Sequence, residues 1–158
     1  MLSKMLKANA KKTASARKPV FSIWYVVFGL VLVCGFLFLT PKSTKLSLND
    51  KTFFVEVAKD KNARAKGLSG REKLLPYHGM LFVFDSPGKH CFWMKDMKFS
   101  LDIIWIDESK TVVDVAKYVS PQTYPEFFCP SRPAKYTLEV AAGSIEQAGL
   151  EPGTLVQF

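Results

Sequence analysis

The stretch LDIIWIDESKTVVDVAK, residues 101–117, decides the fold class of this chain. Residues 101–106 and 111–117 are rich in isoleucine and valine, which favour strands. The four polar residues between them, 107–110, have the length of a hairpin loop. The stretch therefore predicts a β-hairpin, and its first strand is apolar on both faces.

Further strands are predicted on both sides of this hairpin. They are expected at residues 52–58, 79–84, 135–140 and 155–158, with an extended piece at 91–94 and a turn at 85–89. In residues 135–140, Tyr136, Leu138 and Val140 alternate with Lys135, Thr137 and Glu139, which predicts a half-buried strand.

Two short helices and one irregular loop complete the pattern. The first helical turn is expected within residues 60–70, ending near Gly67 or Gly70. The second begins at Ser144, where Gln147 would complete a capping box. Residues 120–133 hold four of the nine prolines and are expected to be irregular. About seven short strands separated by turns predict a mainly β, small sandwich- or barrel-like domain with one or two short helices.

An apolar segment precedes this domain. Residues 20–39 contain no charged side chain, and a helix of that length spans about 30 Å, which matches the core of a bilayer. A buried core helix would show a polar stripe, and a cleaved signal peptide would show a shorter apolar run with a cleavage site. Neither feature is evident in residues 20–39. The segment therefore predicts a single transmembrane helix whose bilayer contact anchors the chain.

Charge predicts the topology and the division of the chain. The net charge is +8, and residues 1–19 hold six basic residues and no acidic one, so the rest has 16 basic and 14 acidic residues. Positive flanks stay in the cytoplasm, which puts the later domain outside it, at the cell (inner) membrane. No nucleic-acid partner is expected. The predicted parts are a basic cytoplasmic tail, a transmembrane helix, a linker and an exported β-rich domain, at residues 1–19, 20–39, 40–50 and 51–158.

Six motifs occur in an order that resembles a known bacterial and archaeal family, "domain of unknown function 192". They are Arg64-x-x-Gly67-Leu68-x-x-Arg71, Gly79-Met80-Leu81-Phe82-x-Phe84, Phe92-Trp93-Met94-Lys95-Asp96, Leu101-Asp102-Ile103-Ile104-x-Ile106-Asp107, Cys129-x-Ser131-x-Pro133 and Leu138-Glu139-Val140-x-Ala142-Gly143. The resemblance implies a compact, mainly β, sandwich-like fold and brings no settled activity or cofactor. The sequence departs from the family pattern at Ser69, where the family usually has Met, and at Asp96-Met97.

Asp102 is the first candidate functional residue. Strand alternation places it on one face with Ile104 and Ile106, so it is expected to be at least partly buried and to need a cation or several donors. This arrangement would be either a structural ion pair or a pocket for a polar or anionic ligand, and no motif supports catalysis. The candidate ligand-binding residues are Arg64, Arg71, Trp93, Lys95, Asp96 and Asp102.

The two cysteines of the exported part, Cys91 and Cys129, form a second candidate pair. An oxidising compartment favours a disulfide between them. Two alternatives stay open: buried free thiols, and a reactive Cys129 paired with His78 or His90.

Soft-metal binding is a third hypothesis. His90, Cys91 and Met94 carry ligand types that suit Cu(I), although alternation on a strand would point Cys91 and Met94 to opposite faces. Methionines are more often core residues. No cofactor is expected otherwise.

The aromatic residues near the proline-rich loop have two interpretations. They could cap one end of the fold, which is the favoured interpretation, or line a binding rim. These residues are Tyr118, Tyr124, Phe127 and Phe128.

Together these patterns predict a membrane-anchored extracytoplasmic module that is non-catalytic and binds a ligand or protein of the cell envelope. The alternative is a soft-metal (copper) or thiol-active envelope protein.

Overall fold

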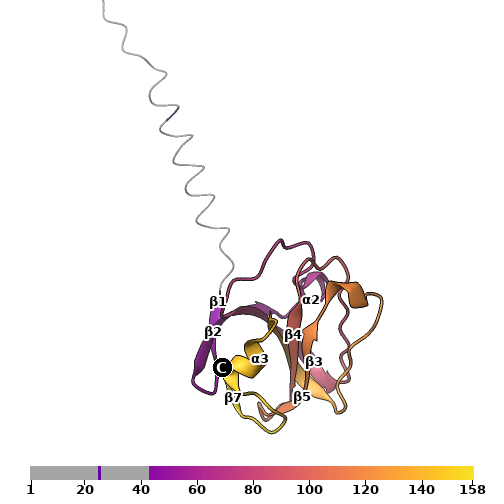
Figure 1. Cartoon of the computed structure of the whole chain (residues 1–158). Coiled ribbons are helices and arrows are strands. Elements are labelled where there is room, and N and C mark those ends of the chain that lie inside the picture. The colour runs from indigo at the N-terminus through magenta and orange to yellow at the C-terminus, as the bar shows by residue number, and fades with distance from the viewer. Residues whose placement is uncertain (1–24, 26–42) are drawn as a thin grey trace, which may run out of the picture. The chain divides into compact units, whose positions relative to one another are not determined.

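Seven strands form one curled sheet in the order β5-β4-β6-β3-β2-β1-β7 (Figure 1). The computed structural model describes Tyr25 and residues 43–158. The strands are β1 (Ser43–Leu48), β2 (Lys51–Ala58), β3 (His78–Gly88), β4 (Leu101–Ile106), β5 (Val112–Val119), β6 (Ala134–Ala141) and β7 (Val156–Gln157). The helices are α2 (Lys61–Lys66), α3 (Ser144–Ala148) and the 3₁₀ turn η1 (Pro121–Thr123). The mainly β class with two short α-helices is thus confirmed.

The transmembrane prediction concerns residues 20–39, which lie outside the described residues except for Tyr25. Among the residues that the structure does describe, no helix has the length and apolar character needed to cross a bilayer.

The sheet curls far enough for its outer strands to meet. β7 pairs with β1 at one edge. On its other side, residues 153–156 bond to the start of β5: Val112 N–H donates to Thr154 O at 2.9 Å and Val156 N–H donates to Lys110 O at 2.9 Å. An isolated bridge joins Thr111 and Leu155. The result is a curled half-barrel made from one sheet, not a sandwich of two sheets.

Each face of the sheet covers its own hydrophobic core. The inner core holds Leu81, Ile104 and Leu138, together with Ile145 of α3. Figure 1 shows α3 inside the curve of the sheet. The outer core holds Leu68, Phe82, Ile103 and Trp105, and is covered by the segments that follow α2 and β3.

The central hairpin forms as the sequence predicts. β4 and β5 pair antiparallel, and every residue of β4 is buried. Alternation places Leu101, Ile103 and Trp105 in the outer core and Ile104 and Ile106 in the inner core, as expected. A strand with two apolar faces therefore marks an interior strand of this sheet, with a neighbour on each side.

Residues 43–48, which lie within the expected linker of residues 40–50, form β1. Leu46 and Leu48 enter the inner core, and Asn49 adopts a left-handed conformation in the turn to β2. The Asn49 side chain donates to the carbonyl oxygen of Ala148 at 2.7 Å. This bond ties the β1–β2 turn to the end of α3.

Two local predictions are corrected. Residues 85–88 extend β3 instead of forming a turn. Ser144 does not cap α3, because the capping position is Gly143 in the left-handed region with no side-chain bond. The cap comes from β4, where Asp102 Oδ2 accepts from Ile145 N–H at 2.9 Å.

Candidate functional site

A hollow of about 550 Å³ lies on the outer face of the sheet. This volume is within the range of small-molecule sites. The pocket is bounded by the end of α2 and the turn after it, by β3, by the segment after β3, and by one residue of β6. Its lining residues are Arg64, Ala65, Lys66, Gly67, Leu68, Ser69, Phe82, Phe84, Lys89, His90, Cys91, Phe92, Trp93, Met97 and Glu139.

Aromatic rings form the walls of this pocket. Phe82 meets Phe92 edge to face, with ring centroids 4.9 Å apart. Phe84 and His90 stack with centroids 3.5 Å apart, and the His90 Nε2 atom lies 3.1 Å from the Ser86 carbonyl oxygen. These contacts hold the rings in place, so the walls are formed before any ligand arrives.

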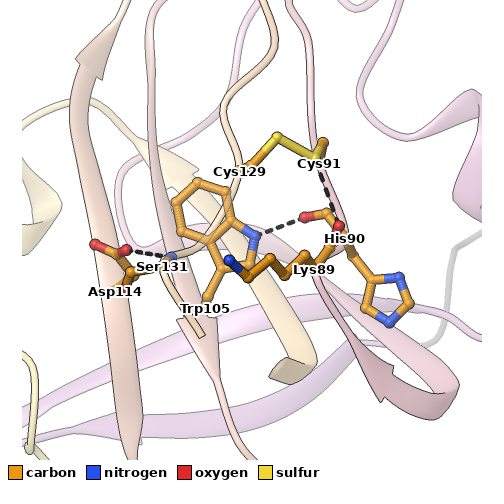
Figure 2. Close-up of a disulfide and its surroundings, with 7 residues drawn as sticks. All are labelled: Lys89, His90, Cys91, Trp105, Asp114, Cys129 and Ser131. Atoms are coloured by element: carbon orange, nitrogen blue, oxygen red, sulfur yellow. Dashed lines mark hydrogen bonds between the residues drawn. A yellow bond between two sulfur atoms is a disulfide. The ribbon is translucent and has the colours of Figure 1, made fainter. Parts of the chain in front are cut away.

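Two further links fix the segment that carries His90 and Trp93. The indole N–H of Trp105, in β4, donates to the His90 carbonyl oxygen at 2.9 Å (Figure 2). Cys91 is joined to Cys129 by a disulfide, which confirms the predicted pairing and excludes free thiols at these two positions. Because Phe92 and Phe128 also form a bridge, the proline-rich loop is fastened beside the pocket.

Glu139 is the one acidic side chain that lines the pocket. It lies on β6 between Met80 of β3 and Ile103 of β4, and it is only 6% exposed. No hydrogen bond or salt bridge holds its carboxyl group among the described residues. Burial raises the pKa of Glu139 to about 8, against a weaker opposing effect of the Arg71 guanidinium. The carboxyl group is therefore mostly protonated at neutral pH.

Basic residues at the end of α2 form the opposite side of the pocket. Arg64 donates to the Val83 carbonyl oxygen at 3.0 Å, and its guanidinium lies 5.5 Å from the centroid of Phe84. Its salt bridge to Asp85, at 3.5 Å, is long and exposed. Lys66 is exposed and has no salt bridge within the described part of the chain. The pocket thus has a buried acid inside and positive charge at its rim.

Two of the six predicted ligand-binding residues, Arg64 and Trp93, line this pocket. Arg71 instead forms a two-pronged salt bridge with Glu56, at 2.5 and 2.8 Å, between two smaller neighbouring pockets. This bond lowers the pKa of Glu56. Lys95 and Asp96 are exposed beside the pocket, and the Lys95 ammonium lies 5.7 Å from the Trp93 ring centroid.

Asp102 is fully buried, and of the two expected ways to stabilise it, a cation or several donors, the structure has the donors. Its carboxylate accepts from the backbone N–H groups of Tyr118 at 2.8 Å and Ile145 at 2.9 Å. Neither Lys95 nor the two arginines reach it. Asp102 therefore links β4 to β5 and to α3, and it does not line the pocket.

The aromatic residues of the proline-rich loop divide into two groups. Phe128 packs against the outer core. Tyr124 and Phe127 are 45% and 58% exposed and contact Trp93, itself 43% exposed, with centroids 5.6 and 5.1 Å away. These contacts place Tyr124 and Phe127 beside the pocket through Trp93, which favours the alternative of a binding rim for these two residues.

The three metal candidates do not come together. Cys91 is in the disulfide, Met94 is buried in the outer core, and His90 stacks on Phe84. Within the described residues there is no group of three or more His, Cys, Asp or Glu side chains that could hold a metal ion.

Glu139 was not among the predicted site residues, because strand alternation along residues 135–140 predicts that its side chain lies on the exposed face of a half-buried strand. Thr137 and Glu139 are both buried. A signal was present: β6 lies between two strands with continuous apolar runs, 79–84 and 101–106, so neither of its faces is open.

Comparison with known structures and families agrees with this fold. A crystal structure from Sinorhizobium meliloti 1021, described as a candidate transcription regulator, is 27% identical with a TM-score of 0.70, covering 75% of this chain and 95% of its own. A protein of unknown function from Novosphingobium aromaticivorans is 26% identical with a TM-score of 0.69, covering 73% and 85%. No curated protein matches the chain.

The family comparison covers most of the domain. Residues 44–158 match the family DUF192, described as an uncharacterised ACR, and this match begins within β1 and ends at the last residue of the chain. The chain belongs to the DUF192 family.

Proposed function

We propose that this protein is a membrane-anchored, extracytoplasmic module that binds a small ligand in the 550 Å³ pocket without transforming it. The observation that supports this most directly is the buried Glu139 carboxyl group, which has no partner among the described residues and lies in a pocket with aromatic walls. Buried polar groups are normally paired. A pocket that leaves one unpaired is suited to a ligand that supplies the partner.

The other reactive groups of the pocket support binding over catalysis. Cys91, the thiol residue of the lining, is held in the disulfide. The His90 ring is stacked on Phe84 and directs Nε2 to the Ser86 carbonyl oxygen. Glu139 is therefore left without an activated nucleophile beside it, and catalysis of the acyl-transfer type would need one.

The anchoring part of the proposal rests on residues 20–39, which have the length and composition of a transmembrane helix. Both half-cystines of the Cys91–Cys129 disulfide are exposed, and such bonds persist in oxidising compartments. We do not propose a transcription-regulator role, as in the description of the Sinorhizobium relative, because beyond residue 19 the chain has 16 basic against 14 acidic residues. DNA-binding domains usually carry a marked basic excess.

Ligand binding is tested by methionine-methyl NMR on the full-length chain in detergent. The five methionines give five signals, of which Met97 lines the pocket, while Met1 and Met5 lie far away in sequence as internal controls. Adding a deproteinised small-molecule extract of the cell envelope should shift the Met97 signal and leave those of Met1 and Met5 unchanged. An unchanged Met97 signal would refute the proposal.

The anchor is tested separately. The full-length chain should stay in the membrane pellet after alkaline carbonate extraction, and protease added to the extracytoplasmic side should digest residues 43–158. Release by carbonate would refute the anchor, and protection from the protease would refute the topology.

The alternative, a soft-metal or thiol-active protein, has less support. It is favoured only by the exposure of the Cys91–Cys129 disulfide next to the pocket. Intact mass measured after thiol blocking, with and without reductant, distinguishes the two functions. A Cys91–Cys129 bridge in the protein from its own membrane supports the binding module, and free thiols at both of these positions support thiol chemistry.

A further inference from the structure

An acidic group and two basic groups occupy different parts of the pocket that contains Glu139. The acidic group is on β6, in the middle of the sheet, and is almost fully buried. The basic residues Arg64 and Lys66 are in the last turn of α2 at the pocket's edge. A ligand that satisfies both must itself carry opposite charges at separate ends.

The inner end of the pocket favours a cationic group. A carboxylate formed at Glu139 would be stabilised by a positive charge beside it, and aromatic faces also attract cations. Phe82 and Phe92, which are buried and half-buried, provide such faces among the lining residues. An ammonium group is the smallest common cation that can also donate hydrogen bonds to the carboxylate.

The outer end favours an anion. Lys66 is exposed with no salt bridge in the part of the chain that the structure describes. The one salt bridge of Arg64 in that part is the long contact to the exposed Asp85, and its guanidinium also donates to the carbonyl oxygens of Lys59 and Val83. Lys89 also belongs to the lining, but Figure 2 shows its side chain and the His90 ring extending in different directions. Lys66 and Arg64 therefore carry the argument for an anionic group.

We propose that the pocket binds a zwitterionic small molecule, with a primary ammonium group at Glu139, an apolar or aromatic body along Phe82 and Phe92, and an anionic group near Arg64 and Lys66. This inference rests on the proposed function and specifies its ligand class. Because Glu139 is mostly protonated in the empty pocket, binding of the ammonium group displaces its proton to solvent.

Three probes with one common ring test the proposal: 4-(aminomethyl)benzoate, which is zwitterionic, 4-methylbenzylamine, which carries only the ammonium group, and 4-methylbenzoate, which carries only the carboxylate. Dissociation constants are measured on the full-length chain from the Met97 methyl shift. The zwitterion should bind about tenfold or more tightly than the acid, because a well-placed charge contact contributes about 1.4 kcal/mol or more.

Two variants assign each end of the ligand. Glu139→Gln should remove the preference for the zwitterion over the acid and leave the affinity for 4-methylbenzoate unchanged. Lys66→Gln should weaken both carboxylate probes several-fold and leave 4-methylbenzylamine unchanged. Glu126→Gln, at an exposed position outside the pocket, serves as the matched control and should change none of the affinities.

A pH series on the unmodified chain provides a second measurement that needs no variant. The affinity for 4-methylbenzylamine should rise about fivefold from pH 7 to pH 8, as the pKa of Glu139 of about 8 requires. The other titratable groups facing this carboxyl are Arg64, Lys66, Lys89, Arg71 and His90. Glu139→Gln should abolish this rise in the affinity for 4-methylbenzylamine. A rise that persists in the variant would contradict the proposal.

Failure of this inference differs from failure of the proposed function. If the envelope extract shifts the Met97 signal but none of the three probes does, or if the acid binds as tightly as the zwitterion, the ligand class is refuted and the binding function stands. If neither the extract nor any probe shifts Met97, both are refuted.

Discussion

Two buried carboxyl groups of this protein are stabilised in different ways. Asp102 accepts hydrogen bonds from two backbone N–H groups, at 2.8 and 2.9 Å. Glu139 has no such donors among the described residues, and its raised pKa keeps it neutral instead. The first arrangement stabilises the fold and the second leaves a group free for a ligand.

Replacement of Asp102 by Ala should lower the free energy of unfolding by about 2–4 kcal/mol, because the N–H groups of Tyr118 and Ile145 would lose their acceptor in a buried site. Urea denaturation measures the change. Glu126→Ala, at an exposed position, is the control and should cost less than about 0.5 kcal/mol. Equal losses in both variants would contradict the structural role of Asp102.

Glu139 should make stability fall as pH rises. Its pKa rises from 4.5 to about 8 on folding, so the folded state binds the extra proton between these values. The stabilisation is complete below the lower value and is lost as pH increases through the upper one, at about 1.4 kcal/mol per pH unit. Between pH 6 and pH 8, the free energy of unfolding of the Glu139→Gln variant should therefore increase by about 2 kcal/mol relative to that of the unmodified chain. Parallel stability curves for the two proteins would refute the burial of an unpaired carboxyl group.

At the scale of secondary-structure elements, the proline-rich loop is attached to the body by a few defined links. The disulfide joins Cys129 to Cys91, and Ser131 N–H donates to Asp114 of β5 at 2.8 Å (Figure 2). These links place Tyr124 and Phe127 beside Trp93 at the pocket rim.

Replacing both Cys91 and Cys129 by Ser should lower the free energy of unfolding by about 2–4 kcal/mol, because the bond closes a loop with a sequence separation of 38 residues. Amide exchange should accelerate most in residues 120–133 and least in β4. Chemical reduction of the disulfide in the unmodified chain should likewise lower the free energy of unfolding and accelerate amide exchange in residues 120–133. If exchange in the loop stays unchanged, the bond does not restrain it.

The close pairing of β3 and β6 depends on Gly79. A Cβ atom at this position would lie 2.4 Å from the Glu139 carbonyl oxygen and 2.9 Å from Val140 Cγ1. Gly79→Ala should therefore lower the free energy of unfolding by about 2–4 kcal/mol, as measured by thermal or urea denaturation. Gly70→Ala is the control, since nothing lies within 4 Å of its Cβ and only its positive φ adds strain, about 1 kcal/mol. A smaller cost at Gly79 than at Gly70 would contradict this close packing.

The elements that the sequence predicted share a local signal. The 101–117 hairpin combines two β-branched runs with a polar loop, and Cys91 and Cys129 are the two cysteines of residues 40–158. By contrast, β1 contains only two buried leucines, and its assignment depends on partners elsewhere in the chain. Glu139 became a candidate only when the segments covering the outer face were known, because alternation alone does not say which face is exposed.

At the scale of the whole molecule, a very short strand completes the sheet. β7 has two residues and contacts both β1 and, through residues 153–156, the start of β5. Val156 is buried in the inner core, whereas its neighbour Leu155 is 60% exposed.

These two neighbours test how much the closure of the sheet contributes. Val156→Ala should lower the free energy of unfolding by about 1–3 kcal/mol, through loss of buried apolar contacts. Leu155→Ala should change it by less than about 0.5 kcal/mol. Chemical denaturation compares the two, and an equal effect would show that β7 does not seal the core.

The position of β6 between β3 and β4 has a consequence for the growing chain. Before residues 134–141 leave the ribosome, β1, β2 and β3 can pair with each other and β4 can pair with β5, but the two groups have no common strand. The nascent protein therefore holds two separate sub-sheets, each with an unpaired edge, until synthesis is nearly complete. Insertion of β6 then joins them, so this domain is expected to complete its fold in a single late step.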